Sequence, residues 1–509
     1  MKKIIVLVAA FLVAGVTGCK KDFLSQEVNP NAPSVATPAL LLSAALNNSA
    51  RIVVNDYVGF GVWAGYWTTS GNYVPNQTLN EYQITNTSLN TSWGDWYANL
   101  TNYNNIQASA AKDPSQANFQ AIAMIMKAYG FQMLVDEFGD VPYSQAFQPS
   151  TIIFPAYDKA QDIYEDLGKQ LDAAIALIQK SGAAAASPGS SDIVFAGNMG
   201  NWAKFANSLK LRLAVRVSGP LDANTSDALV AGLAATASVG YLDASSEAYA
   251  NPGYINAAGK QNPYYGGFGF DQNGNPGGNG VYYRANAFEV DQMEAFNDPR
   301  LTQIFNLVSP PPGSPANTPN GVRGNIFGDV SSNLLTNSYT STTAGPGLVV
   351  SPSQGQPLFL GSESLFLQAE AVNSGFLPAA TVGLSDVAGA QALYQDAITA
   401  SFKELGATGA DAYYTNGKNN VDWTASPNKE QAIITQKWIA LTGNFPFEGW
   451  NEYRRTGYPA VPASIDPSKV NATTPYRVLY PNTELSTNTA NLGKEGTIDP
   501  FNTKIFWMK

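Results

Sequence analysis

The sequence contains no histidine and only one cysteine among its 509 residues. Without an imidazole there can be no Ser-His-Asp triad and no zinc site built on histidine ligands. One cysteine permits no disulfide within the chain, so the fold must be held together by burial. Charged residues are sparse, at 13%, and the formal net charge is −10. This balance argues against nucleic acid as a partner, because phosphate binding depends on clustered lysine and arginine.

The sequence also lacks any stretch that is long and apolar enough to span a membrane. The nearest candidate is the apolar run Ile4–Val16, which follows Lys2 and Lys3 at the N-terminus. It is shorter than the roughly 20 residues that a membrane-spanning helix requires. A short positive segment before such a run is typical of a secretory signal peptide.

The single cysteine, Cys19, stands directly after this run. The segment Val16–Cys19 (VTGC) resembles the lipobox of bacterial lipoproteins, in which the cysteine is acylated and becomes the new N-terminus after cleavage. The resemblance implies a signal peptide over residues 1–18 and a lipid on Cys19. An ordinary signal peptide followed by an incidental cysteine is the alternative. A lipid would account for the odd exported cysteine and would anchor the chain without inserting it into the membrane.

Helical periodicity is present in two separated blocks of the chain. In Asp158–Lys180, apolar residues recur at steps of three and four, which predicts one apolar helix face. Asp158 is the expected N-cap and Ser181-Gly182 the expected stop. The same spacing predicts helices that include Ile122–Met133, Trp202–Leu213, Glu363–Asn373, Gln391–Leu405 and Lys429–Leu441.

Between the two blocks, residues 221–361 are rich in glycine, proline, asparagine and serine. This composition predicts irregular structure with short β segments, for example Gly347–Ser351. Loops of this length are usually functional or poorly ordered. The predicted fold class is therefore mainly α, with helical hairpins that form a scaffold and a long, irregular, loop-rich insertion.

Six segments in order along the chain carry a resemblance to one family. They are LVDEFGDVPYS (Leu134–Ser144), WAKFANSLKLR (Trp202–Arg212), NDPRL (Asn297–Leu301), FLQAEA (Phe366–Ala371), QKWIAL (Gln436–Leu441) and EGWNEYRRTGYP (Glu448–Pro459). Together, behind a lipobox, they are similar to the SusD/RagB-like nutrient-binding lipoproteins of the bacterial outer membrane. The resemblance covers nearly the whole chain after Cys19.

This resemblance implies tetratricopeptide-like helix pairs and a partner, a SusC-like TonB-dependent outer-membrane transporter that the lipoprotein caps. The implied ligand is an oligosaccharide, or in some members a peptide. The expected protein is non-catalytic, needs no cofactor, and is lipid-anchored at the outer membrane on the cell surface. We expect a flexible tether over residues 19–38 and a SusD-like binding domain over 39–509. That domain would comprise a helical scaffold (39–220), a loop-rich variable region (221–361), and helices with C-terminal loops (362–509).

The carboxylates in these segments leave a rival hypothesis open, a surface glycoside hydrolase that uses a carboxylate pair. Their spacing favours structural roles instead. Asp136 and Asp140 are predicted to cap turns and helix ends. The charged residues within Glu448–Arg455 are predicted to form a structural salt-bridge cluster.

A glycan site is expected where exposed aromatic rings are interleaved with polar side chains, because sugars present flat C–H faces bordered by hydroxyls. Two segments have this character, Trp63–Tyr103 and Tyr254–Tyr283. From them we predict six ligand contacts: Trp67, Tyr73, Trp93, Tyr264, Tyr265 and Tyr283. Helix packing or transporter contact is the alternative for each residue, and Trp93 and Trp96 could share the buried face of a helix.

One further segment, Asp271–Asn275, resembles the opening of a calcium-binding loop. However, Pro276 stands where such loops have glycine, and Tyr282 stands where they have a bidentate glutamate. We therefore predict a polar turn at this position and no metal site.

Overall fold

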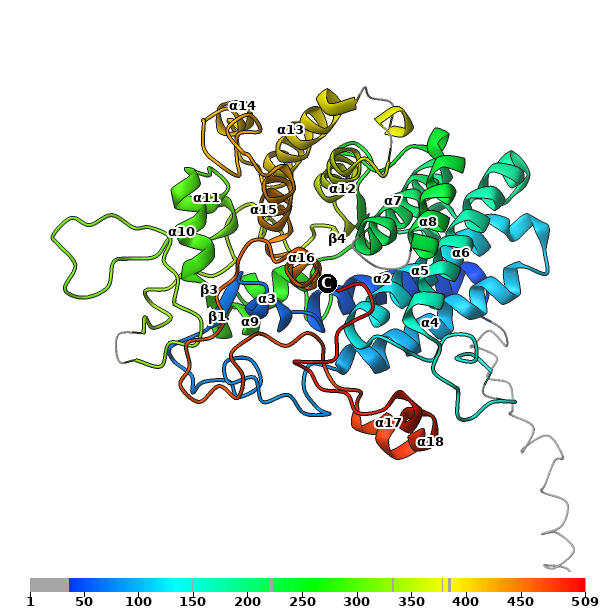
Figure 1. The fold of residues 1–509 in the computed structure, drawn as a ribbon, viewed down its shortest axis with the longest axis horizontal. Helices are drawn as coiled ribbons and strands as arrows, with labels where there is room; N and C mark the ends of the chain where they lie inside the picture. The colour runs from blue at the N-terminus through cyan, green and yellow to red at the C-terminus, as the bar shows by residue number, and fades with distance from the viewer. Residues whose placement is uncertain are drawn as a thin grey trace, which may run out of the picture.

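The computed structural model describes residues 36–148, 150–218, 223–331, 334–377, 379–382 and 386–508. The predicted signal peptide, Cys19 and nearly all of the predicted tether lie outside this range. The described residues are mainly helical, as predicted, and their strands form only two short pairs (Figure 1). None of the helices in these ranges is both long and apolar enough to cross a membrane.

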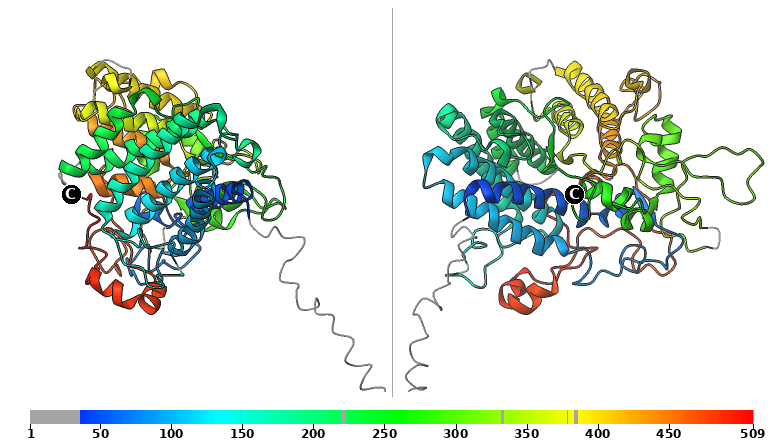
Figure 2. Two further views of the ribbon diagram at one scale, coloured as in Figure 1. Left: turned by 90° about the vertical axis from the view of Figure 1, so that its right-hand side faces the viewer. Right: turned by 180° about the vertical axis from the view of Figure 1, so that it is seen from behind.

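The first helical block lies on one side of the molecule, where successive helices pack against one another as hairpins (Figures 1 and 2). Its helices are α2 (Pro38–Asn55), α4 (Thr91–Ala110), α5 (Ala117–Phe138), α6 (Ala160–Ser181), α7 (Met199–Val217) and α8 (Ala223–Ala235). α5 is buried on almost every face because α2, α4, α6 and α7 all contact it. α6 has a single apolar face, as its periodicity predicts.

The ends of α6 are only partly as predicted. The helix ends at Ser181 and is followed by Gly182 with a φ of 47°, which confirms the expected stop. The prediction that Asp158 is its N-cap is wrong. Asp140 Oδ1 instead accepts the N–H of Ala160 at 2.8 Å, while Asp158 Oδ2 accepts the backbone N–H of Tyr143 at 2.9 Å. Asp140 therefore caps the start of α6 from across a turn, as predicted for this residue.

The second helical block contains the remaining predicted helices. They are α12 (Gly361–Ser374), α13 (Asp386–Glu404), α15 (Lys429–Leu441) and α16 (Pro446–Thr456). α12 and α13 form a hairpin, and α12 also contacts α7 of the first block. α15 begins where Asn428 accepts the N–H of Gln431 at 3.0 Å, and its bounds are those predicted.

The predicted loop-rich region 221–361 begins too early, because residues 223–235 form α8, which packs on α6 and α7. The rest of it is irregular, as predicted, but contains short elements. These are β2 (Ala248–Ala250), a π-helix (Tyr265–Gly269), α9 (Gly278–Tyr282), β3 (Tyr283–Ala285), α10 (Ala287–Phe296), α11 (Leu301–Ile304) and β4 (Gln356–Phe359). β2 pairs with β4. The predicted strand Gly347–Ser351 is wrong. This segment turns so that Gly347 donates to the carbonyl of Gln303 at 2.9 Å, and a Cβ at this position would collide with the carbonyl of Leu405.

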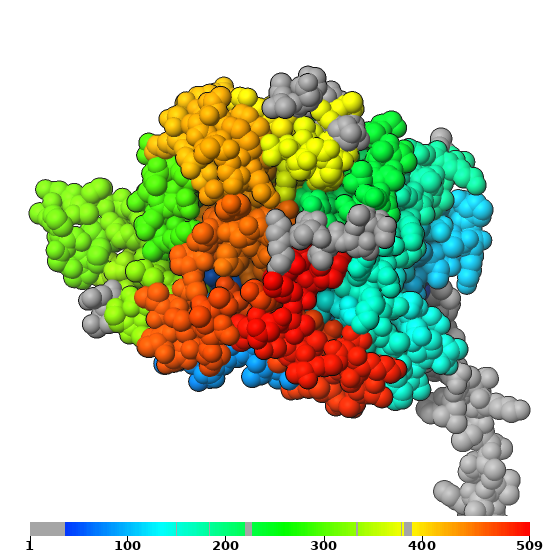
Figure 3. Space-filling model, viewed as in Figure 1, coloured from blue at the N-terminus to red at the C-terminus, as the bar shows by residue number. Residues whose placement is uncertain are grey.

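The C-terminal residues fold back over the first block. Figure 3 shows them, in orange to red, across one face of the molecule. The segment is loop-like, as predicted, apart from two short helices, α17 (Asn482–Thr487) and α18 (Thr489–Leu492). Tyr480 donates its hydroxyl to the carbonyl of Asp140 at 2.6 Å, and Trp507 Nε1 donates to Asp136 Oδ1 at 2.9 Å. These bonds fix the tail against the end of α5.

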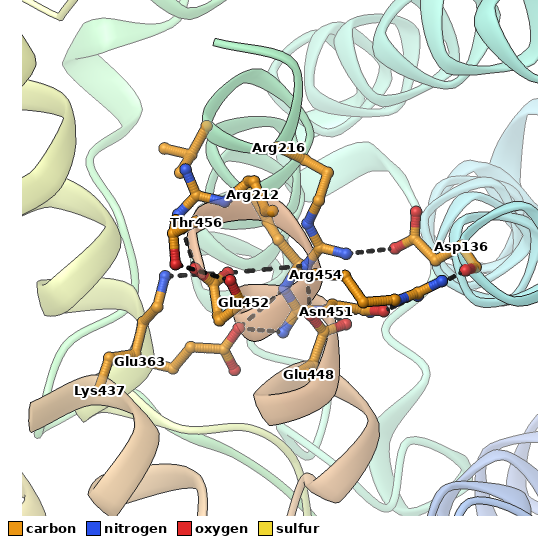
Figure 4. Close-up of polar contacts among 12 residues, drawn as sticks. Asp136, Arg212, Arg216, Glu363, Lys437, Glu448, Asn451, Glu452, Arg454 and Thr456 are labelled. Atoms are coloured by element: carbon orange, nitrogen blue, oxygen red, sulfur yellow. Dashed lines mark hydrogen bonds and ion pairs between the residues drawn. The ribbon is translucent and has the colours of Figure 1, made fainter. Parts of the chain in front are cut away.

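A buried ion network joins the two blocks (Figure 4). Arg216 on α7 pairs with Asp136 on α5 at 2.6 Å and with Glu448 on α16. Arg212, one turn earlier, pairs with Glu363 on α12 at 2.7 Å. The members of the network are Asp136, Arg212, Arg216, Glu363, Glu370, Lys437, Glu448, Glu452 and Arg455, and all are buried. The predicted salt-bridge cluster in Glu448–Arg455 is therefore confirmed for Glu448, Glu452 and Arg455, whereas Arg454 donates to the carbonyls of Asp136 and Tyr476 instead.

Burial and ion pairing act in opposite directions on the carboxylates of this network. Burial would raise the pKa of Glu448, but Arg216 and Arg212 together hold it below its ordinary value. Burial dominates at Asp136, whose pKa is raised although Arg216 opposes the change. Asp136 lies in the last turn of α5, but its carboxylate accepts from side chains and caps no helix end, so the prediction that it is a cap is wrong.

Removing one member of this network should destabilise the protein strongly. We expect Glu448→Ala to lower the free energy of unfolding by about 3–5 kcal/mol, because Arg216 and Arg212 would remain buried without this partner. Urea denaturation followed by tryptophan fluorescence measures the change. Lys159→Ala is the control, since its pairs with Asp140 and Glu495 involve an exposed lysine and should contribute less than about 1 kcal/mol. Equal losses in the two variants would contradict the structural importance of the network.

Candidate functional site

A short strand pair brings the two predicted aromatic segments together. β1 (Trp67–Thr69) follows the short helix α3 (Phe60–Trp63), and it pairs antiparallel with β3. In this register Trp67 lies opposite Ala285, and Thr69 lies opposite Tyr283. Residues that are far apart in the sequence thus form one continuous region of structure.

Four of the six predicted ligand contacts are buried within this structure. The exposed fraction is 1% for Trp67, 6% for Trp93, 1% for Tyr264 and 9% for Tyr283. Because stacking on a sugar requires an open ring face, the prediction of an exposed ring is wrong for these four residues.

Each buried ring has a packing role that explains its position. Trp67 donates from Nε1 to the carbonyl of Val58 at 3.0 Å. Tyr264 stacks on Phe268, with centroids 4.7 Å apart, and its hydroxyl donates to the carbonyl of Thr343 at 2.7 Å. Trp93, on α4, packs edge-on against Phe138 of α5. Trp93 and Trp96 are both on the buried side of that helix, as the alternative interpretation predicts.

The other two predicted contacts, Tyr73 and Tyr265, reach the surface. Tyr73 is 45% exposed, and its ring lies 5.3 Å from the ring of Tyr282, tilted by 58°. Asn76 Nδ2 donates to the hydroxyl of Tyr282 at 2.9 Å, which fixes the orientation of that ring. Tyr282 lies in the predicted segment but is not among the six residues. It ends α9, so its side chain is directed differently from that of the neighbouring buried Tyr283.

Amide groups surround the two tyrosines. Asn337 donates from its backbone N–H to Asn72 Oδ1 at 2.7 Å and from Nδ2 to the carbonyl of Val281 at 3.2 Å. The hydroxyl of Ser70 also bonds to Asn337 Oδ1. Asn337 was not predicted, because its Asn-, Ser- and Thr-rich loop has no periodicity and only the fold brings it here. We refer to Tyr73, Tyr282, Asn72, Asn76 and Asn337 as the tyrosine–amide surface.

A second pair of accessible rings lies on the π-helix. Tyr265 is half-buried and Phe270 is 44% exposed, with ring centroids 6.4 Å apart. The π-helix packs directly on α9, which ends at Tyr282. This packing requires glycine, since a Cβ at Gly277 or Gly280 would collide with the backbone of the π-helix. The glycine-rich sequence here thus reflects close contact between two backbone segments.

The neighbouring Asp271–Asn275 segment is a polar turn, as predicted. Asp271 Oδ1 accepts the backbone N–H groups of Asn273 and Asn275, each at 2.8 Å. Across the described ranges, no cluster of three or more Asp, Glu, Cys or His side chains could hold a metal ion.

One carboxylate pair deserves comparison with a hydrolase site. Asp56 and Asp95 line a cavity of about 320 Å³ between α2 and α4, together with Arg51 and Asn102. Burial, and then the charge and hydrogen bond of Asp95, raise the pKa of Asp56 to about 7. Glycosidases hold their two carboxyl groups about 5–5.5 Å or about 6.5–9.5 Å apart. A raised pKa of this kind suits a general acid, so Asp56 and Asp95 are the carboxylates that a hydrolase hypothesis would have to use.

Comparison with known proteins identifies one family. A SusD-like family model, described as starch-binding and associating with the outer membrane, matches residues 30–481. No curated protein sequence matches the chain.

Solved structures show the same fold at low sequence identity. A chitin-binding protein is 24% identical with a TM-score of 0.75, over 93% of this chain and 100% of its own. A SusD-like protein from Bacteroides thetaiotaomicron is 22% identical with a TM-score of 0.73, over 92% and 98%. A chitin-binding SusD homologue from Flavobacterium johnsoniae is 24% identical with a TM-score of 0.69, over 91% and 97%. The fold, including its tetratricopeptide-like hairpins, is therefore that of SusD-like proteins.

The Asp56–Asp95 pair predicts a pH-dependent stability. The pKa of Asp56 is 3.8 ordinarily and about 7 in the fold, so its stabilising contribution is complete below pH 3.8 and is lost as the pH rises through 7. We expect Asp56→Asn to raise the free energy of unfolding at pH 8 by roughly 2 kcal/mol, allowing for partial solvent access, and to have little effect at pH 4. Urea denaturation at both pH values tests this. The control Asp291→Asn, at an exposed position of α10, should show no such difference between the two pH values.

Proposed function

Because this chain belongs to the SusD-like family, whose members are described as starch-binding and associated with the outer membrane, we propose that it captures oligosaccharides without cleaving them. It then delivers them to a SusC-like TonB-dependent transporter. The observation that carries the proposal is the tyrosine–amide surface, where two accessible rings are bordered by side-chain amides.

The geometry of this surface suits a saccharide chain. The two tyrosine rings are tilted by 58°, so they offer two differently directed faces to successive sugar units. Asn72, Asn76 and Asn337 supply donors and acceptors for the hydroxyl groups at the ring edges. Tyr265 and Phe270 extend the accessible aromatic area across the packed π-helix and α9.

The buried predicted residues have a supporting role in this proposal. Trp67, in β1, and Tyr264 both pack against Phe268 of the π-helix. Tyr283 contacts Trp67 and Tyr282, which links this packing to the surface. Trp93 lies apart from them, on α4.

Two arguments favour binding over hydrolysis. Asp136, Glu370, Glu448 and Glu452 of the family-like segments are engaged in the buried ion network, and Asp298 pairs with the buried Arg300, so a glycan has no access to them. The Asp56–Asp95 pair lies between α2 and α4, whereas the tyrosine–amide surface is built on other segments. The proposed activity therefore consists of recognition and transfer.

Removing either ring should weaken glycan binding. We expect Tyr73→Ala and Tyr282→Ala each to raise Kd at least about tenfold, as is typical of aromatic contacts at the centre of a binding surface. Calorimetry with chitin and malto-oligosaccharides, using the chain from Lys20 onward, measures the change. Phe154→Ala and Tyr414→Ala are matched controls, because they remove one exposed and one half-buried ring on other elements. Binding of peptides alone would overturn the ligand class, and release of sugar products would overturn the non-catalytic role.

The lipid anchor is tested separately. The lipobox resemblance and the family's association with the outer membrane support a lipid on Cys19 that holds the chain at the cell surface. We expect Cys19→Ala to abolish incorporation of labelled fatty acid and to remove the protein from the outer-membrane fraction. Ser25→Ala, in the same segment, should leave both unchanged. Persistent labelling of the Cys19→Ala variant would contradict this assignment.

A further inference from the structure

A buried arginine lies at the centre of β3, close to the tyrosine–amide surface. Arg284 is 8% exposed and pairs across the strands with Thr68. Its neighbours in β3, Tyr283 and Ala285, belong to the hydrophobic core. Because side chains alternate along a strand, Arg284 points to the opposite side from both of them.

The guanidinium of Arg284 is incompletely satisfied. It donates from Nη2 to the carbonyl of Val281 at 3.2 Å and from Nη1 to the carbonyl of Thr340 at 3.4 Å, whereas its buried Nε has no hydrogen-bond partner. No carboxylate of the described residues forms an ion pair with it. Arg454, also buried and without an ion pair, likewise has an unpartnered Nε, but its guanidinium lies 3.6 Å from the ring centroid of Trp450, whereas no aromatic ring of the described residues stacks on Arg284. A buried cation without a counter-charge is costly, which calls for a functional reason.

The contacts of Arg284 connect it to the proposed binding surface. The carbonyl of Val281 accepts from both Arg284 and Asn337, and Asn337 in turn contacts Asn72. Burial lowers the pKa of Arg284 to about 10, and Tyr73 is the group that partly offsets this decrease. The guanidinium therefore remains charged at neutral pH and lies within electrostatic range of the exposed ring.

We propose that Arg284 makes the tyrosine–amide surface selective for acidic saccharides, whose carboxylate or sulfate supplies the missing counter-charge. This inference rests on the proposed function and specifies its ligand class. The planar fork of arginine matches an anionic group with two oxygens. Since the chain as a whole carries a formal charge of −10, its overall field does not attract anions. A preference for acidic saccharides must therefore arise from a local contact such as the one proposed for Arg284.

The test compares acidic sugars with neutral sugars of the same length. Calorimetry on the chain from Lys20 onward, which includes every described residue, measures Kd for oligogalacturonate and its methyl ester. A second arm uses a sulfated oligosaccharide and its desulfated form. We expect the acidic form to bind at least about tenfold more tightly in one arm, since a charge-assisted hydrogen bond contributes that much. The arm that shows the preference identifies the anionic group.

The variants separate ligand contact from a structural role. Arg284→Gln should reduce the acidic-to-neutral preference to about one while neutral sugars still bind, and Arg284→Lys should retain part of the preference. Arg323→Gln is the matched control, because it removes an equal charge from another arginine bonded to backbone carbonyls. If Arg284→Gln prevented folding, the affinities for acidic and neutral sugars would fall together. The acidic-to-neutral preference of the unaltered chain would then still decide whether the surface selects acidic saccharides.

Two results would overturn the inference in distinguishable ways. If the unaltered chain binds neutral and acidic forms equally in both arms, the role of Arg284 is wrong and the proposed function stands. If no saccharide binds, the proposed function fails and the inference fails with it.

Discussion

The fold depends on a set of charges that are buried where the two helical blocks meet. The single side chain of Arg216 contacts both Asp136 on α5 and Glu448 on α16, two helices that are far apart in the sequence. Charges taken out of water are stable only when their partners are held in a defined geometry. The network therefore specifies how the helices of the two blocks are placed. This explains why the segments that resemble the family most clearly are structural: they supply the charges of the network.

The same helices position the proposed binding surface. Tyr66, next to β1, donates its hydroxyl to the carbonyl of Trp438 on α15 at 2.7 Å, and Trp438 Nε1 donates to the carbonyl of Ala64 at 2.7 Å. Phe60 on α3 stacks on Trp450 of α16. β1 is thus attached to the two helices that carry Lys437, Glu448 and Glu452, and β3 is attached to β1. Tyr73 is on a loop and Tyr282 ends the short helix α9, but the elements next to them are fixed to the core.

The sequence predicted the helices well because an amphipathic or buried helix has a period that can be recognised in the residues. It predicted the general regions of the candidate site but not the individual residues. Tyr282 and Tyr283 are adjacent and chemically identical, and only the change from α9 to β3 decides which of them reaches the surface. Asp136 was predicted to be a cap because a glycine follows soon after it, whereas the helix continues to Phe138. Arg216, the ion-pair partner of Asp136, is 80 residues away in the sequence. Partners so distant in sequence leave no local pattern.

The position of Trp507 has a consequence for the order in which the molecule can assemble. Its indole completes the surroundings of Asp136, and Glu448 and Glu452 complete those of Arg216. A chain that emerges from its N-terminus cannot finish the interior of its first helices until its last residues have appeared. Until then the Asp136–Arg216 pair lacks the indole and the two glutamates that complete its surroundings. The interior of the first helices can therefore be completed only after the whole chain has been made.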